Sequence, residues 1–232
     1  MMVLAGPSTF RTLHHRRLAE GVVEELVGRI RRGEFPPGAR LPSERSLVET
    51  LGVSRAVIRE ALVYMQQAGI VHTRQGAGSF VSAGLGVPDA GEAAAELQDL
   101  FELRMAVETE AAALAALRST DGDRQRMAAA LERFDAAAAH ARLGVEADFD
   151  FHHAVVQASH NRYFVHALAG LTEALLRSVF LSRIRSIAVE GRSRMVQREH
   201  RAVFERIMAG DADGARAAMR RHLEAARQRL TG

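Results

Sequence analysis

Four side chains in the C-terminal half of the chain have the types and the spacing of a metal-binding set. Asp148 and His152 are four residues apart, so they project from the same face of a helix. His200 lies ten residues before Gly210 and His222 twelve residues after it, or about 15 and 18 Å along helices that rise ~1.5 Å per residue. In an antiparallel helix pair the two imidazoles would stand at nearly the same height. One carboxylate and three imidazoles would then converge, a donor set that suits Zn²⁺, Ni²⁺, Mn²⁺ or Fe²⁺.

Histidines inside helices have a second, more common explanation, because most of them are solvated or hydrogen-bonded to a neighbouring group. The four residues alone therefore leave the metal site as one of two interpretations. His153 points about 100° away from His152 around a helix, and we interpret it as a bystander. The isolated histidines are interpreted as solvated: His14, His15, His72, His140 and His166.

A second group of functional side chains lies near residue 55. Ser54 is a favourable helix N-cap, and Arg55 and Arg59 follow four residues apart on one face of the helix that it would begin. The N-terminus of such a helix offers free backbone N–H groups, a hydroxyl and two guanidiniums. These groups suit phosphates and guanine edges. The alternative is a small helical subdomain whose arginines are only solvated.

Serine and glycine residues mark the ends of the elements that would position these arginines. One helix is expected from the Ser43 cap to Gly52, and a second from the Ser54 cap to Gly69. The apolar side of the second helix recurs at helical spacing: Ile58, Ala61, Leu62 and Met65. The strands of a hairpin follow at residues 70–72 and 79–81. This order of elements is the plan of a winged helix-turn-helix, which places its second helix in the DNA major groove.

Helical periodicity dominates the rest of the chain. A first helix is predicted over residues 13–32, with a buried side made by Val22, Val23, Leu26, Val27 and Ile30. Alanine-rich amphipathic segments follow residue 92 without any strand signal, and they predict six helices at 93–118, 121–142, 145–159, 162–186, 188–209 and 212–230. The expected fold is mainly α, with an N-terminal winged helix-turn-helix that carries a small β-hairpin wing and a C-terminal all-α bundle.

Breaks in these patterns divide the chain into domains. Residues 10–82 are predicted to form the DNA-binding domain, and residues 92–232 an all-α domain for effector binding and dimerisation. Between them, the segment 83–91 interrupts all periodicity and is interpreted as a linker.

Charge and composition favour a DNA-binding protein. Residues 1–84 hold eleven arginines against seven acidic residues, whereas residues 85–232 hold twenty against twenty-one, so the excess positive charge is N-terminal. Cysteine is absent, which excludes disulfides and thiolate metal sites. No apolar run approaches the ~20 residues that span a bilayer, and the N-terminus does not resemble a signal peptide. We therefore expect a cytoplasmic protein without membrane contact.

The string RLPSERSLVETLGVSRAVIREAL, which begins at Arg40, resembles the DNA-binding domain of GntR-family bacterial transcription regulators. The resemblance implies DNA contacts from the LPSER arginine, the start of the second helix and the tip of the wing. By position, these are Arg45, Ser54, Arg55, Arg59, Gln75 and Gly76. Ala56 and Val57 replace threonines that relatives often have, so these two positions are not carried over.

From about residue 97 to 230 the sequence resembles the FCD effector domain of the FadR branch of this family. The matching pieces are FELRMAVE, DFDFHHAVVQASHN and EHRAVFERIMAGDADGARAAMRRHL. In metal-containing members the ligands are an aspartate, the histidine four residues later and two further histidines, which here are Asp148, His152, His200 and His222. His160 replaces a glycine of the family pattern. We expect Arg104 to join the metal in an anion pocket; the alternative is a surface pair of Arg104 with Glu108.

These features predict a transcription regulator, by family habit a repressor, whose operator affinity is modulated by a small carboxylate effector at a divalent transition metal. Because one winged helix offers few base contacts, we expect a homodimer, held mainly by the helical domain, on a palindromic operator. The alternative is a metalloenzyme or metal-dependent hydrolase in the bundle, but the sequence has no HExxH and no GxSxG. A third possibility is an architectural DNA-binding protein without an effector, against which the convergent polar set argues.

Overall fold

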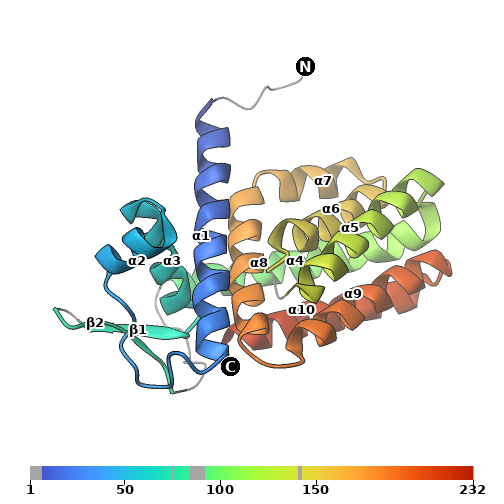
Figure 1. Ribbon diagram of the computed structural model, residues 1–232. Helices are drawn as coiled ribbons and strands as arrows, with labels where there is room; N and C mark the ends of the chain where they lie inside the picture. Colours follow the sequence, from blue (N-terminus) through green and yellow to red (C-terminus); the bar gives the residue numbers. More distant parts are fainter. Residues whose placement is uncertain (1–6, 75, 84–91, 141–142, 232) are drawn as a thin grey trace. The chain divides into compact units, whose positions relative to one another are not determined.

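The computed structural model describes residues 7–74, 76–83, 92–140 and 143–231 (Figure 1). The chain divides into two compact units, residues 1–88 and 89–232. Residues 84–91, which include nearly all of the predicted linker, lie outside the described residues, as does Gln75. Each unit is therefore treated by itself.

The N-terminal unit is a winged helix-turn-helix, as the sequence predicted. Its elements are α1 (Pro7–Arg31), α2 (Glu44–Leu51), α3 (Arg55–Gln67), β1 (Val71–Arg74) and β2 (Gly78–Val81). The Ser43 hydroxyl accepts the N–H of Ser46 at 3.2 Å and the Ser54 hydroxyl accepts the N–H of Val57 at 3.3 Å, so both predicted caps are formed. Gly52 ends α2 with a φ of 67°, a conformation that glycine adopts without strain.

Three helices and the wing close a small core in the described part of this unit. Helix α1 packs on α3. The predicted apolar sides are buried except at Ile30, which is only half-buried at the end of α1; the buried residues are Val22, Val23, Leu26 and Val27 in α1, and Ile58, Ala61, Leu62 and Met65 in α3. The strands pair antiparallel with Val71 opposite Val81. Helix α1 begins at Pro7 rather than at the expected residue 13, because proline suits the first position of a helix, where its missing N–H is not needed.

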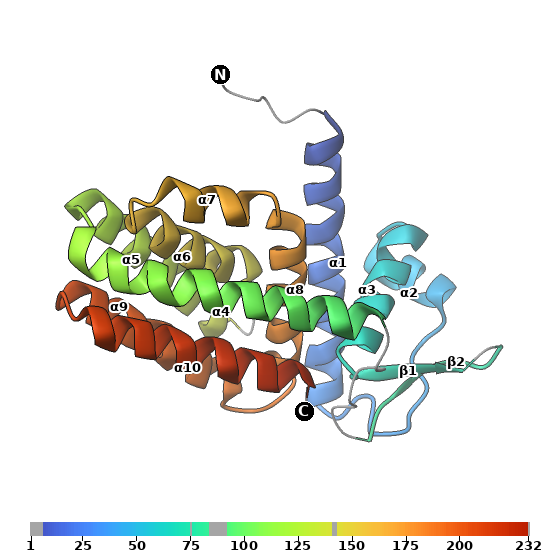
Figure 2. The ribbon, with the colours of Figure 1, turned by 180° about the vertical axis from the view of Figure 1, so that it is seen from behind.

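The C-terminal unit is an all-α bundle. Its helices are α4 (Glu92–Arg118), α5 (Asp121–Ala139), α6 (Val145–Ala158), α7 (Arg162–Ala169), α8 (Thr172–Ile187), α9 (Arg192–Met208) and α10 (Ala212–Thr231). Helix α4 lies along α10, and α10 along α9 (Figures 1 and 2). Helix α8 runs crosswise to them and contacts α4, α6, α9 and α10.

The bundle has seven helices in its described part, not the six predicted, because the expected helix 162–186 is broken. Helices α7 and α8 bend by 74° at residues 170–171. Gly170 is a weak helix former, and the Thr172 hydroxyl donates to the carbonyl of Ala169 at 2.9 Å, which satisfies a carbonyl that the break sets free. Within the described residues no single helix is long and apolar enough to cross a membrane; α7 and α8 pass that test only as a bent pair.

His160, which stands where the family pattern has glycine, adopts a φ of 51° between α6 and α7. A residue with a side chain is strained in this region. Its Nε2 lies 2.9 Å from Oδ2 of Asp123 in the first turn of α5, so the imidazole ties α6 to α5. Burial would raise the pKa of Asp123, but hydrogen bonds from Thr120 and His160 lower it to about 2.

Candidate metal centre and DNA-binding surface

The first turn of α3 presents the side chains that the sequence proposed for DNA. Ser54, Arg55 and Arg59 are exposed there, as is Arg45 in α2. Val57 points into the core with 1% of its surface exposed, so it has no route to a base. Ala56 is exposed between the two arginines.

Two of these guanidiniums already have acidic partners. Arg55 Nε donates to Glu44 Oε2 at 3.1 Å, and Arg45 Nε donates to Glu49 Oε1 at 2.9 Å. Arg59 makes no ion pair with any residue that the structure describes. Arg59 is therefore the guanidinium of α3 that has no acidic partner among the described residues. Exposed ion pairs of this kind contribute little, about 0–1 kcal/mol, so DNA can displace Glu44 and Glu49.

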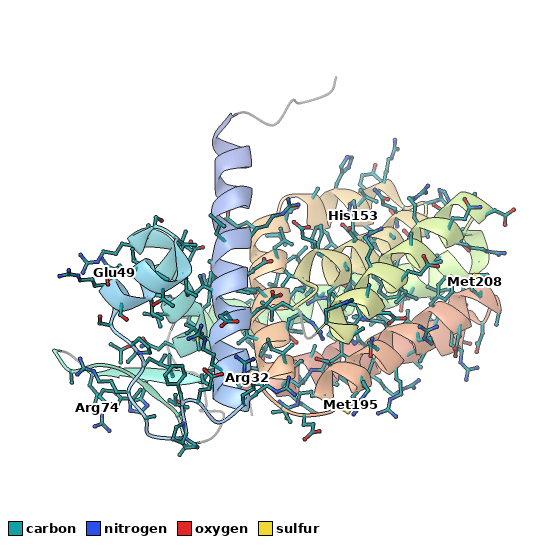
Figure 3. All side chains as sticks on the ribbon, viewed as in Figure 1. Arg32, Glu49, Arg74, His153, Met195 and Met208 are labelled. Atoms are coloured by element: carbon teal, nitrogen blue, oxygen red, sulfur yellow. The ribbon has the colours of Figure 1, made fainter. Side chains whose placement is uncertain are left out.

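The wing adds cations that the sequence argument did not single out. Gly76 stands at its tip with a φ of 74°. The guanidinium of Arg74 lies 5.0 Å from the centroid of the Phe80 ring, and Figure 3 labels Arg74 on the wing. The Nε atom of Arg40 lies 3.1 Å from the place that a Cβ atom at Gly78 would occupy. Arg40 and Arg74 thus both lie against the hairpin, although they are far apart in the sequence and no local pattern predicts that they share this surface.

Three predicted metal ligands meet inside the C-terminal bundle. His152 comes from α6, His200 from α9 and His222 from α10, and all three are buried. The Nε2 atom of His152 lies 3.1 Å from Nε2 of His222 and 3.3 Å from Nε2 of His200. The carboxylate of Asp148 borders the same point, with Oδ1 3.6 Å from Nε2 of His152 and Oδ2 3.9 Å from Nε2 of His200. The structure thus brings all four predicted residues together.

The outer nitrogens of two of these imidazoles are held by buried acids. His152 Nδ1 lies 2.5 Å from Glu108 Oε2, and His222 Nδ1 lies 2.9 Å from Glu199 Oε2. Because a carboxylate only accepts hydrogen bonds, each Nδ1 is the protonated nitrogen of its ring. In the neutral rings the Nε2 lone pairs then face one another. This arrangement is unfavourable by itself and becomes favourable around a cation.

The electrostatics of the cluster favour neutral imidazoles at His200 and His222. Burial, and then the charges of His222 and His152, lower the pKa of His200 well below its usual value. Burial also lowers the pKa of His222, although its hydrogen bond to Glu199 works in the opposite direction. Burial would raise the pKa of Glu108, but the charges of Arg104 and His152 keep it below its usual value. Neutral rings oriented by ionised carboxylates are the form in which histidine binds metals.

The spacing of the donors fits a transition-metal ion. Imidazole nitrogens at about 2.1 Å from an ion lie roughly 3.0 Å apart at a right angle and roughly 3.4 Å apart at the tetrahedral angle. The observed separations of 3.1 and 3.3 Å fall between these values. The three histidines therefore form a triad that could hold a metal. The sequence analysis did not identify Glu108 and Glu199 as its supporting acids; their partners are 44 and 23 residues away.

Arg104 lies beside this cluster but is not the surface residue of the alternative interpretation. It is 3% exposed, and its Nε donates to Glu108 Oε1 at 2.6 Å. A cavity next to it is bordered by Arg104, Glu108, Phe149, His152, His153, Leu168, Ala169, Thr172, Leu175 and Val179. His153, interpreted as a bystander, stacks on Phe149. The cavity thus reaches both a proposed ligand and the proposed effector residue.

Comparison with known proteins agrees with the division of the chain into two units. Residues 18–81 match the bacterial regulatory proteins of the gntR family, and residues 99–225 match the FCD domain. A regulatory protein assigned to the L-lactate dehydrogenase operon of Escherichia coli K12 is 33% identical over 219 residues, 90% of this chain and 84% of the relative. The Glc operon transcriptional activator of the same organism is 31% identical over 231 residues, 93% of this chain and 89% of the relative.

A solved structure shares the fold. Lar, which controls expression of the Listeria monocytogenes agr system, has a TM-score of 0.50 at 19% identity, over 91% of this chain and 95% of that chain. The relatives are named as transcription regulators, not as enzymes, which decides against the metalloenzyme alternative. The chain therefore belongs to the GntR family of bacterial transcription regulators, as a DNA-binding protein whose C-terminal domain is an FCD domain.

Proposed function

We propose that this regulator is a repressor that binds a palindromic operator as a homodimer. A small carboxylate effector, bound at a divalent metal in the FCD domain, changes its affinity for the operator. The observation that carries the proposal is the convergence of three imidazoles, in which Nε2 of His152 lies 3.1 Å from that of His222 and 3.3 Å from that of His200. Carboxylates fix the Nδ1 atoms of His152 and His222. Because its operator is chromosomal DNA, we place the protein in the cytoplasm.

His152, His200, His222 and Asp148 would hold the metal, which we propose to be Zn²⁺, Ni²⁺, Mn²⁺ or Fe²⁺. When bound, such an ion supplies a Lewis-acidic position for a carboxylate oxygen. Arg104 supports a carboxylate effector from the side of the cavity, since its guanidinium is buried and lies 3.5 Å from the imidazole of His152. The apolar side chains that border the cavity exclude water from the same place.

The experiment that tests the proposal is a titration of a mapped operator with protein in the presence of a panel of organic and sugar acids. We expect at least one acid to weaken operator binding by the metal-loaded protein. An acid that strengthened binding would act as a corepressor or as the ligand of an activator, and one relative is named an activator. Operator affinity that no acid changes would refute the effector role.

We propose that Arg45, Ser54, Arg55, Arg59, Gln75 and Gly76 contact DNA. Replacing Arg59 by alanine should weaken specific operator binding by about 1–3 kcal/mol if it makes a bidentate contact with guanine. The fold should be unaffected because the side chain is exposed and has no partner among the described residues. Band-shift titration measures the loss, and Arg31→Ala, an exposed change at the end of α1, is the control. Unchanged affinity of the Arg59 variant would contradict its assignment.

The proposed homodimer has its own test. We expect light scattering to give twice the mass of the 232-residue chain and the operator complex to contain two chains, one on each half-site. The FCD domain has a net charge near zero, so electrostatic repulsion does not oppose pairing. A monomer at working concentration, with one chain bound per operator, would rule this assembly out.

The proposed supporting role of Glu199 predicts an effect on metal affinity. Replacing Glu199 by glutamine removes the charge that faces Nδ1 of His222, and metal affinity should fall about 10–100-fold, as for other outer partners of ligating histidines. Competition with a chromophoric chelator measures the affinity. Glu205→Gln, an exposed change on the same helix, should leave it unaltered. Equal metal affinities in the two variants would count against the arrangement.

A further inference from the structure

Arg183 in α8 is a buried guanidinium to which the proposed function gives no role. Its side chain is 1% exposed. Its Nε donates to the carbonyl of Leu143 at 2.7 Å, and its Cζ lies 4.5 Å from the centroid of the Phe134 ring. Its Nη1 is buried without a hydrogen-bond partner among the described residues, none of which places a carboxylate within 4.0 Å of it. A buried charge is costly unless it is paired, and the N–H groups of Nη1 are available to donate hydrogen bonds to an anionic ligand.

Arg183 lies on the same side of α8 as two residues that border the cavity next to His152, although Arg183 itself does not border that cavity. Leu175 and Val179 line that cavity, and Arg183 follows Val179 by four residues, so the three share one face. The Phe134 ring beneath its guanidinium meets the His200 ring edge-on, with centroids 4.9 Å apart. Arg183 therefore flanks the candidate metal centre.

The other two buried guanidiniums near the centre have carboxylates of their own. Arg104 is paired with Glu108, and Arg229 donates from both Nη atoms to Glu199 at 2.9 and 3.0 Å. For Arg183, burial lowers the pKa to about 10, and the charge of Asp148 is the largest influence in the opposite direction. A divalent ion at the centre would be bound by Asp148, whose negative charge would then be offset by the ion rather than by Arg183. The ion and Arg183 together would then leave two positive charges without a counter-ion.

We propose that Arg183 is a second anion anchor of the effector site and that the effector is a short dicarboxylate. One carboxylate lies at the metal and the other receives hydrogen bonds from Arg183. The inference rests on the proposed function, because it takes the metal centre as the first anchor. Two negative charges balance the excess that the ion and Arg183 create, whereas a monocarboxylate leaves one positive charge buried. Two anchors on opposite sides of the ligand also fix its length and orientation.

L-Lactate and L-malate form a matched pair of probes, since malate is lactate with a carboxylate in place of one methyl hydrogen. Their affinities for zinc-loaded, full-length protein are measured by calorimetry, with zinc content by elemental analysis. We expect wild type to prefer malate by about tenfold or more, the range for a hydrogen bond to a charged group. Arg183→Met should lose this preference while its zinc content and lactate affinity are unchanged. Arg177→Met, on another face of α8, should behave as wild type.

Each outcome decides the inference. Malate preference retained by Arg183→Met, or wild type that binds lactate as tightly as malate, would overturn the role of Arg183 and leave the effector site standing. If neither acid bound zinc-loaded wild type, the dicarboxylate inference would fail, whereas the proposed function would fail only if no acid of the panel changed operator affinity. Should Arg183→Met fail to fold, the comparison of the two acids on wild type still tests the charge argument. A loss of affinity for both acids by the same factor would show that Arg183 is only structural.

Discussion

His200→Ala should leave protein that retains no stoichiometric metal after purification without chelator or affinity-tag metal. The substitution removes one donor of four, and the loss should exceed the roughly 10–100-fold that an outer partner costs. His200 is buried and its Nε2 lies 3.3 Å from that of His152, so no solvent-exposed group can replace it. Elemental analysis of the purified protein measures the effect.

Loss of the metal should also lower the melting temperature of the protein. A metal that binds only the folded chain stabilises it by mass action, by about 4 kcal/mol at a thousandfold excess over Kd. For a domain of this size that corresponds to roughly 8–16 °C in Tm. Chelator-treated wild type should melt lower than metal-loaded wild type by about this amount, and metal should not raise the Tm of His200→Ala.

His153→Ala is the matched control for this prediction. His153 neighbours a ligand in the sequence, but it is half-buried and stacks on Phe149. Its removal should change neither metal content nor the response of Tm to metal. Wild-type protein without stoichiometric metal under the same conditions would refute the proposed centre, whatever the variants do.

The sequence predicted the set of metal ligands because the residues within each of two pairs, Asp148 with His152 and His200 with His222, have spacings that place them side by side on helices. Asp148 and His152 share a helix face, and His200 and His222 stand at matching heights on either side of the turn at Gly210. The structure brings these four residues together at one point. Glu108 and Glu199 were not identified, because each supports a histidine on another helix and long-range pairs leave no periodic signal. Hydrogen bonds of this kind are set by tertiary packing.

The burial of Arg183 and the break between α7 and α8 are two further features that the sequence pattern could not predict. Arginine is seldom buried, so no sequence pattern pointed to Arg183, whose side chain the packing of the bundle buries. The apolar pattern of residues 162–186 continues through Gly170, and its periodicity cannot show that the helix bends there by 74°. The winged helix-turn-helix was predicted closely because its caps and glycine turn are local signals.

Removing the metal should uncouple the effector from DNA. Metal-depleted protein should still bind its operator, because the proposed DNA contacts lie in the N-terminal unit and the proposed ligands in the other. An effector can change operator affinity only if it prefers one arrangement of the protein over another. At the proposed site it would touch ligands from α6, α9 and α10 together, so it can favour one packing of these helices.

The expected coupling is about 1–3 kcal/mol, which is about 5–150-fold in operator affinity. Metal-loaded protein should show a change of this size with an active acid, and chelator-treated protein should show little change. His152→Ala should behave like the chelator-treated protein, while His166→Ala, an exposed change on α7, should behave like wild type. The decisive measurement is operator affinity with and without the acid, in metal-loaded and metal-depleted wild type. An equal response in both would mean that the metal is structural and that the acid binds elsewhere, because a ligand of the metal cannot act equally well without it.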